Sequence, residues 1–192
     1  MRGWTALPSA SRWLQTRWRC SKFDQAGPQA WKKRRLAELG LPAPNFVPVD
    51  FETNDDWWTQ LVASGFDTNR PAVVAASGVS MYLTRDAVVA TLRRVAALAP
   101  GSAFAMTFLV PIEQMGAEVR PGFEMAAKGA RANGTPFISF FTPQEMLHVA
   151  REAGFHAAQH VSADMLAARY FADRGDGLRP PANAEELLIA TR

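Results

Sequence analysis

Cysteine is nearly absent from this chain. Cys20 is the only one among 192 residues, so neither an internal disulfide nor a metal site built from several cysteines is possible. The three histidines, His148, His156 and His160, do not occur at a zinc-binding spacing with a third ligand. We therefore expect no metal site and assign these histidines no role.

Long hydrophobic runs are also missing. The longest apolar stretch, residues 87–100, is interrupted by Arg93 and Arg94, whereas a membrane-spanning helix needs about 20 mainly apolar residues. The N-terminus has no apolar segment of the kind that a secretory signal requires. We expect a cytoplasmic protein without a membrane partner.

The first 23 residues contain no acidic side chain, although they include four arginines and one lysine. Residues 1–22 show no sustained periodicity and are expected to be an atypical, non-native or poorly ordered segment, as a shifted frame or start codon would produce. The basic run Lys32–Arg35 lies within an expected helix and is interpreted as its solvated face. No nucleic-acid partner is expected, and the oligomeric state is left open.

The remaining sequence alternates between strand and helix patterns. Val73 and Val74 lie in a continuous apolar run, which is typical of a strand buried on both faces of a parallel sheet. Thr84 and Thr142 precede amphipathic stretches and predict helix starts. Such alternation indicates a doubly wound α/β sheet. Strands are expected at 20–23, 45–51, 72–76, 102–109, 155–161 and 186–191, and helices at 28–40, 54–65, 84–99, within 111–134 and at 142–154.

Polar residues follow three of these strands, where parallel sheets bind ligands. Asp24 ends the first strand, and a carboxylate there can accept hydrogen bonds from ribose hydroxyls. Asp50 can accept a hydrogen bond from an exocyclic amine while Phe51 covers the ring, which suits adenine. The alternative is that Asp50 caps the next helix and Phe51 belongs to the core.

The third strand is followed by residues 77–82, which contain two serines and a glycine. Gly78 and Ser80 match part of the G-x-S-x-G turn of hydrolases, but Tyr82 stands where that turn needs a small residue. No acid in a distinctive context precedes a histidine, as the hydrolase order requires. A serine hydrolase using Ser80 remains a distant alternative.

Together these segments resemble the leucine carboxyl methyltransferase family, in particular its bacterial, actinobacterial-type branch of S-adenosyl-L-methionine-dependent methyltransferases. The resemblance covers about residues 22–192 and gives no acceptor identity. It rests on Phe23–Gln25, Trp31–Leu36, Phe46–Glu52, Ser77–Thr84 and Phe137–Phe141.

The resemblance implies a class I methyltransferase fold over residues 23–192, with a mostly parallel sheet and S-adenosyl-L-methionine as cofactor. It also implies O-methylation of a small molecule or carboxylate, with the excursion at residues 111–134 over the acceptor pocket. No catalytic base is assigned. The implied donor-site residues are Asp24 at the ribose, Asp50 and Phe51 at the adenine, and Ser77 and Gly78 near the donor, with Tyr82 near the acceptor.

The sequence departs from the family at its N-terminal side. The family has a longer preceding part, with a first strand and a Gly-x-Gly turn whose backbone approaches the donor. Residues 7–18 contain no such glycine pair. We therefore expect an N-terminally truncated or frame-shifted form with an incomplete sheet, weak donor binding and reduced activity. The alternative is a non-catalytic remnant that acts as an interaction partner.

Overall fold

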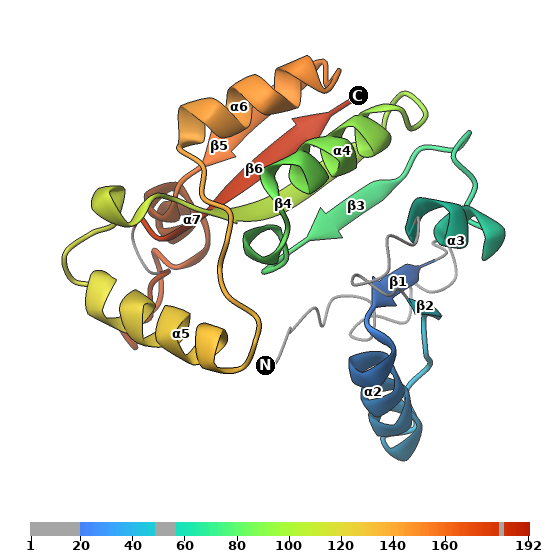
Figure 1. Cartoon of the computed structure of the whole chain (residues 1–192), viewed down its shortest axis with the longest axis horizontal. Helices are drawn as coiled ribbons and strands as arrows, with labels where there is room; N and C mark the ends of the chain where they lie inside the picture. The colour runs from blue at the N-terminus through green and yellow to red at the C-terminus, as the bar shows by residue number, and fades with distance from the viewer. Residues whose placement is uncertain (1–19, 49–56, 181–182) are drawn as a thin grey trace. The chain divides into compact units, whose positions relative to one another are not determined.

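The computed structural model describes residues 20–48, 57–180 and 183–192. The chain divides into two compact units, residues 1–68 and 69–192, which are described separately below (Figure 1). Residues 1–19, and with them most of the atypical N-terminal segment, lie outside the described ranges. Asp50 and Phe51 also lie outside them, so the adenine-site hypothesis stays a prediction.

The first unit contains a two-stranded parallel sheet. Its register pairs Ser21 with Asn45 and Asp24 with Pro48. Helix α2 begins two residues before the expected Pro28 and ends before Gly40, whose φ of +62° is the left-handed geometry of a helix stop. The elements are β1 (Ser21–Asp24), α2 (Ala26–Glu38), β2 (Asn45–Pro48) and α3 (Trp57–Ala63).

The buried face of α2 is not the apolar stripe that Trp31, Leu36 and Leu39 form in the sequence. Leu36 is buried, but Trp31 and Leu39 are 61% and 55% exposed. Gln29 is buried instead, and its Nε2 donates to the carbonyl oxygens of Val47 at 2.7 Å and Lys22 at 3.0 Å. This glutamine therefore joins the helix to both strands of the sheet.

The second unit is built on a four-stranded mixed sheet in the order β3-β4-β6-β5. β3 and β4 are parallel, while β6 runs antiparallel to both β4 and β5. The elements are β3 (Val73–Ala76), η1 (Ser80–Tyr82), α4 (Arg85–Ala96), β4 (Ala103–Leu109), η2 (Ile112–Gln114), α5 (Arg120–Ala132), α6 (Pro143–Glu152), β5 (Ala157–Val161), α7 (Ala163–Tyr170) and β6 (Glu185–Thr191).

The core of the second unit lies where α4 and α6 cover one face of this sheet (Figure 1). Val88 and Leu92 on α4 are fully buried, as are Phe104 and Phe108 on β4. The predicted helix starts are confirmed. Thr84 Oγ1 accepts from the Ala87 amide at 3.2 Å, and Thr142 forms a complete capping box with Glu145.

Strand β3 corrects the expectation of burial on both faces. It pairs with β4 alone within the described residues, and Val73 is 68% exposed. The reason is its position at the edge of the sheet, where one face and one ladder lack a neighbour. Continuous apolar sequence therefore did not indicate a fully buried strand here.

The second unit also contains a short helix, α7, between β5 and β6. Helix α7 begins after Ser162, whose side chain accepts from the Met165 amide at 3.2 Å, and it was not predicted.

Among the described residues, none of the helices combines the length and the hydropathy that a membrane span requires. The same residues contain no cluster of three metal-ligating side chains.

Candidate functional site

Asp24 is the last residue of β1, as predicted. Its Oδ1 accepts a hydrogen bond from the Gln25 amide at 2.9 Å, which orients the carboxylate at the strand end. Lys22 lies two residues earlier, and burial together with the nearby Lys32 lowers the pKa of its ammonium group to about 8. Asp24 belongs to the first unit, whereas Ser77, Gly78 and Tyr82 belong to the second.

In the second unit, Ser77 and Gly78 directly follow β3. Ser77 is exposed, and Gly78 has a φ of +67°, a conformation that side-chain-bearing residues rarely adopt. The Gly78 amide donates to Thr107 Oγ1 on β4 at 2.8 Å, which fixes the turn against the neighbouring strand. A Cβ at Gly78 would meet no atom within 4 Å. The turn therefore presents open backbone at the carboxyl end of a strand.

Ser80 lies two residues after Gly78, in η1. It is buried, and its hydroxyl donates to the carbonyl oxygen of Thr107 at 2.7 Å. A nucleophilic serine has to be accessible and hydrogen-bonded to a general base. Ser80 meets neither condition in the structure, so the hydrolase alternative loses its support.

Tyr82 ends η1 and connects this turn to an aromatic cluster. Its ring centroid lies 5.5 Å from that of Phe137, with the planes at 62°. Burial, followed by the negative charge of Glu185, raises the pKa of the Tyr82 hydroxyl. The phenol is therefore protonated at neutral pH.

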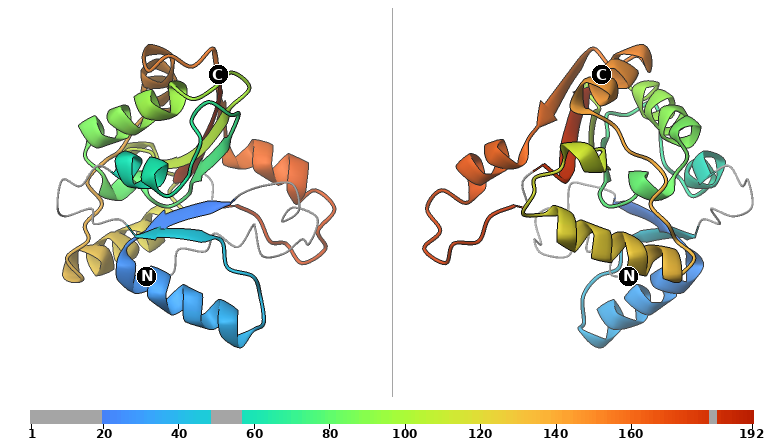
Figure 2. Two further views of the ribbon diagram at one scale, coloured as in Figure 1. Left: turned by 90° about the vertical axis from the view of Figure 1, so that its right-hand side faces the viewer. Right: turned by 60° about the vertical axis from the view of Figure 1, so that its left-hand side comes forward.

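Residues 137–141, which we call the strap, run from the α5 side toward α6 (Figures 1 and 2). The Ile138 amide donates to the Met81 carbonyl at 2.8 Å, and the Phe141 amide donates to the Leu109 carbonyl at 2.9 Å. Ser139 Oγ also donates to the carbonyl of Leu83. These contacts hold the strap against both η1 and the end of β4.

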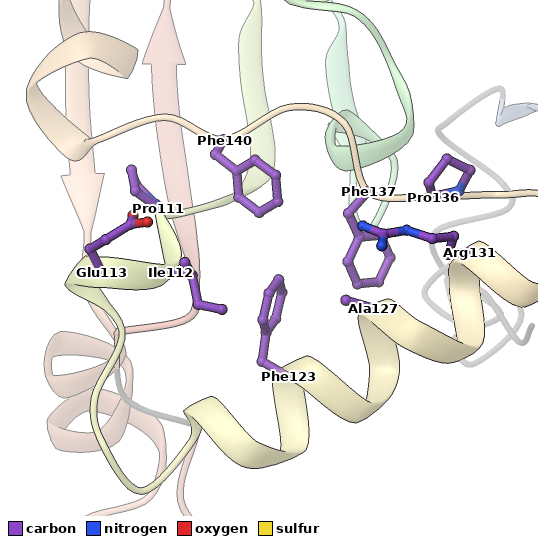
Figure 3. A pocket seen from close by; sticks show the side chains of 9 residues that line it. All are labelled: Pro111, Ile112, Glu113, Phe123, Ala127, Arg131, Pro136, Phe137 and Phe140. Atoms are coloured by element: carbon purple, nitrogen blue, oxygen red, sulfur yellow. The ribbon is translucent and has the colours of Figure 1, made fainter.

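The strap and α5 line an open pocket of about 370 Å³ beyond the end of β4 (Figure 3). The Phe123 ring centroid lies 5.7 Å from that of Phe137 and 6.3 Å from that of Phe140. The remaining lining includes Ile112, Glu113 and Arg131. An aromatic enclosure with a few polar groups is the usual form of a small-molecule site.

Sequence reasoning did not assign these pocket residues. Phe123 and Arg131 belong to the excursion at residues 111–134, which was expected to cover an acceptor pocket; α5 lines a pocket, and its role as the acceptor site stays a prediction. Phe123, Ala127 and Arg131 are spaced four residues apart, so they share one face of the helix. That spacing was the available signal, but nothing local indicated which partner this face would meet.

Residues 11–96 match the family model described as leucine carboxyl methyltransferase. The resemblance to this family is confirmed. Two curated relatives both carry the name "Putative S-adenosyl-L-methionine-dependent methyltransferase", one of them YktD of Bacillus subtilis (strain 168) and the other from Mycolicibacterium paratuberculosis. The chain is 29% identical to YktD over 161 residues, 82% of this chain and 52% of YktD. It is 31% identical to the second over 182 residues, 88% of this chain and 56% of that protein.

The chain thus spans about half the length of these two relatives. Two solved structures support the fold. A DUF574 family protein from Streptomyces avermitilis gives a TM-score of 0.56 at 17% identity, covering 93% of this chain and 68% of its own. The S-adenosylmethionine-dependent methyltransferase SibL gives 0.54 at 16% identity, covering 91% and 43%. The expected class I methyltransferase fold is confirmed.

Proposed function

We propose that this chain is part of an S-adenosyl-L-methionine-dependent methyltransferase, with residues 23–192 contributing its methyltransferase domain. The proposal includes O-methylation of a small molecule or carboxylate. One observation carries it within the second unit: an open glycine turn at the carboxyl end of β3 is joined through Tyr82 and Phe137 to an aromatic pocket. The family match and the names of the relatives agree with this reading.

The turn after β3 fits a donor whose surface has to approach the backbone closely. Gly78 leaves open space where a side chain would stand, and its amide is held by Thr107. Ser77, exposed beside it, offers a hydroxyl for hydrogen bonding. In this proposal Ser77 and Gly78 contact the donor.

When bound, S-adenosyl-L-methionine supplies an electrophilic methyl group on a sulfonium. Ser77 and Gly78 would hold this donor, which would give its methyl group to an acceptor oxygen and leave as the thioether with the electron pair of the broken carbon–sulfur bond. Because the displacement is in line, the protein contributes mainly proximity and orientation. The strap anchors Phe137 and Phe140, so these rings can position an acceptor and exclude water from it.

The acceptor determines whether a base is needed. A carboxylate already carries its negative charge, whereas a hydroxyl has to lose its proton as the bond forms. Tyr82 is not suited to that role because its raised pKa keeps it protonated. The proposal therefore does not use Tyr82 as the base for a hydroxyl acceptor.

Donor binding tests the proposal directly. We expect S-adenosyl-L-homocysteine to bind the 192-residue chain weakly but saturably, observed by ligand-detected NMR. Gly78→Ala should weaken this binding about tenfold or more, because it places a methyl group in the space that the donor occupies and strains the turn.

Gly177→Ala is the matched control. Gly177 has a φ of +71° against +67° for Gly78, and neither position has an atom within 4 Å of a built Cβ. Both variants therefore carry similar backbone strain, but only Gly78 lies in the proposed donor site. Equal donor affinity in the two variants, or no saturable signal from the unmodified chain, would contradict the proposal.

A further inference from the structure

The side chains that line the pocket beyond β4 indicate what kind of ligand it can bind. Three phenylalanine rings from two elements face one volume, with Phe123 on α5 and Phe137 and Phe140 on the strap (Figure 3). Their centroid separations of 5.7 and 6.3 Å fall within the range of aromatic contacts. All three rings are only half-buried, so a ligand ring lying against their exposed parts would contact them. The walls suit a flat aromatic group.

The charged residues of the pocket are placed at opposite ends. Arg131, at the end of α5, lies beside Phe137, and Glu113 of η2 lies at the other end (Figure 3). Neither side chain makes an ion pair or hydrogen bond within the part of the chain that the structure describes. Arg131 thus offers an anion both a charge and a planar set of donors.

Glu113 restricts what can lie at the far end. A second negative charge on the ligand would approach this carboxylate and be repelled. A ligand whose single anionic group points toward Arg131 avoids that repulsion. The volume of about 370 Å³ is near the lower limit of about 300 Å³ for ligand sites, which limits the occupant to a small molecule.

We propose that this pocket binds a small aromatic monoanion, its ring among Phe123, Phe137 and Phe140 and its acid group on Arg131. The identification of this ligand as the methyl acceptor rests on the proposed function. The binding itself does not, because it requires only residues of α5, the strap and η2. Tyr82, which ends η1, contacts Phe137 of the pocket wall.

Three probes of matched shape test the assignment by NMR titration of the 192-residue chain without donor. They are 3-phenylpropionate, its neutral amide, and the cationic 3-phenylpropylamine. We expect the acid to bind about fivefold or more tightly than the amide, since Arg131 is exposed and a charge-assisted contact there is partly screened. Arg131→Gln should remove that preference and leave amide binding unchanged.

Two further variants separate the ring contacts from the charge. Phe123→Ala should weaken all three probes by about three- to tenfold, because the lost aromatic contact is common to them. Lys128→Gln is the matched control, since Lys128 is an exposed cation on α5 that does not line the pocket. It should leave every affinity unchanged. Circular dichroism of each variant checks that the fold is retained.

Several results would overturn the proposal. Equal affinity for the acid and the amide would show that Arg131 does not bind the acid group of the ligand. Tighter binding of the amine would show that the ligand charge is bound by Glu113 instead. An acid preference that survives Arg131→Gln, or disappears in Lys128→Gln, would also refute it. Aromatic-acid binding without S-adenosyl-L-homocysteine binding would support the pocket assignment while contradicting the methyltransferase proposal, so the two failures are distinguishable.

Discussion

The two units of this chain are stabilised in different ways. In the first, the buried apolar side chains among the described residues are Leu36, Val47 and Leu61. The second unit buries a continuous core that includes Phe104 and Phe108 between its sheet and the α4–α6 layer. Since burial of apolar area is the main stabilising contribution to a folded domain, the second unit should be much the more stable.

The first unit compensates with specific contacts instead of a large core. Phe23 stacks on Trp57 with ring centroids 5.1 Å apart, and Trp57 contacts Trp58 edge-on at 5.4 Å. Gln29 adds hydrogen bonds to both strands. The comparison indicates that the stability of the first unit depends on few side chains, whereas that of the second is distributed over many.

The largest expected effect is on stability and comes from replacing a buried leucine by alanine, a substitution that can be made in each unit. Leu92→Ala on α4 should cost about 3–5 kcal/mol, because Leu92 is 0% exposed in a close-packed core. Leu36→Ala on α2 should cost about 2 kcal/mol, since its site is 7% exposed and can relax. Hydrogen exchange measured peptide by peptide reports the loss in each unit. A larger loss from Leu36→Ala would reverse the comparison.

Gln29→Leu should have the next largest effect and act on the first unit. The substitution keeps the side-chain size but leaves the carbonyls of Lys22 and Val47 without their donor, at a cost of about 1–3 kcal/mol. Exchange of residues 21–48 should accelerate while the second unit stays protected. Gln60→Leu on α3 is the control, because the Gln60 side chain makes no hydrogen bond or ion pair within the described residues. Equal effects of the two variants would show that the Gln29 bridge contributes nothing specific.

The same contrast explains what could be predicted from the sequence. Helix starts depend on residues within one turn, so Thr84 and Thr142 were recognised correctly as caps. Strands β4 and β6 were also located within a residue, since their patterns are local. The class I fold followed from the order of these elements and from the family resemblance, and the solved structures confirm it.

Features that depend on distant partners could not be predicted. The burial of Gln29 and the exposure of Trp31 follow from how α2 meets β1 and β2, and the contact to Val47 joins residues 18 apart in sequence. The pocket needs α5 and the strap together, so the roles of Phe123 and Arg131 are visible only in three dimensions. Asp24, Ser77 and Gly78 lie at the predicted strand ends, while their donor contacts remain predictions.

The last expected effect is a pH dependence confined to the first unit, and solvent screening reduces its size because the Lys22 side chain is only partly buried. Burial and the neighbouring Lys32 lower the pKa of Lys22 to about 8, against 10.5 for an unperturbed lysine. Between these two values the unfolded chain binds more protons than the folded one, so the first unit gains stability as the pH rises from about 8 to 10.5. Lys22→Met should remove this gain and raise stability at neutral pH. We would measure the difference in unfolding free energy between the two proteins across that range, which cancels the titration of groups they share. A difference that stays constant with pH would mean that Lys22 keeps its ordinary pKa in the folded protein. The charge of Lys22 in β1 would then not destabilise the first unit.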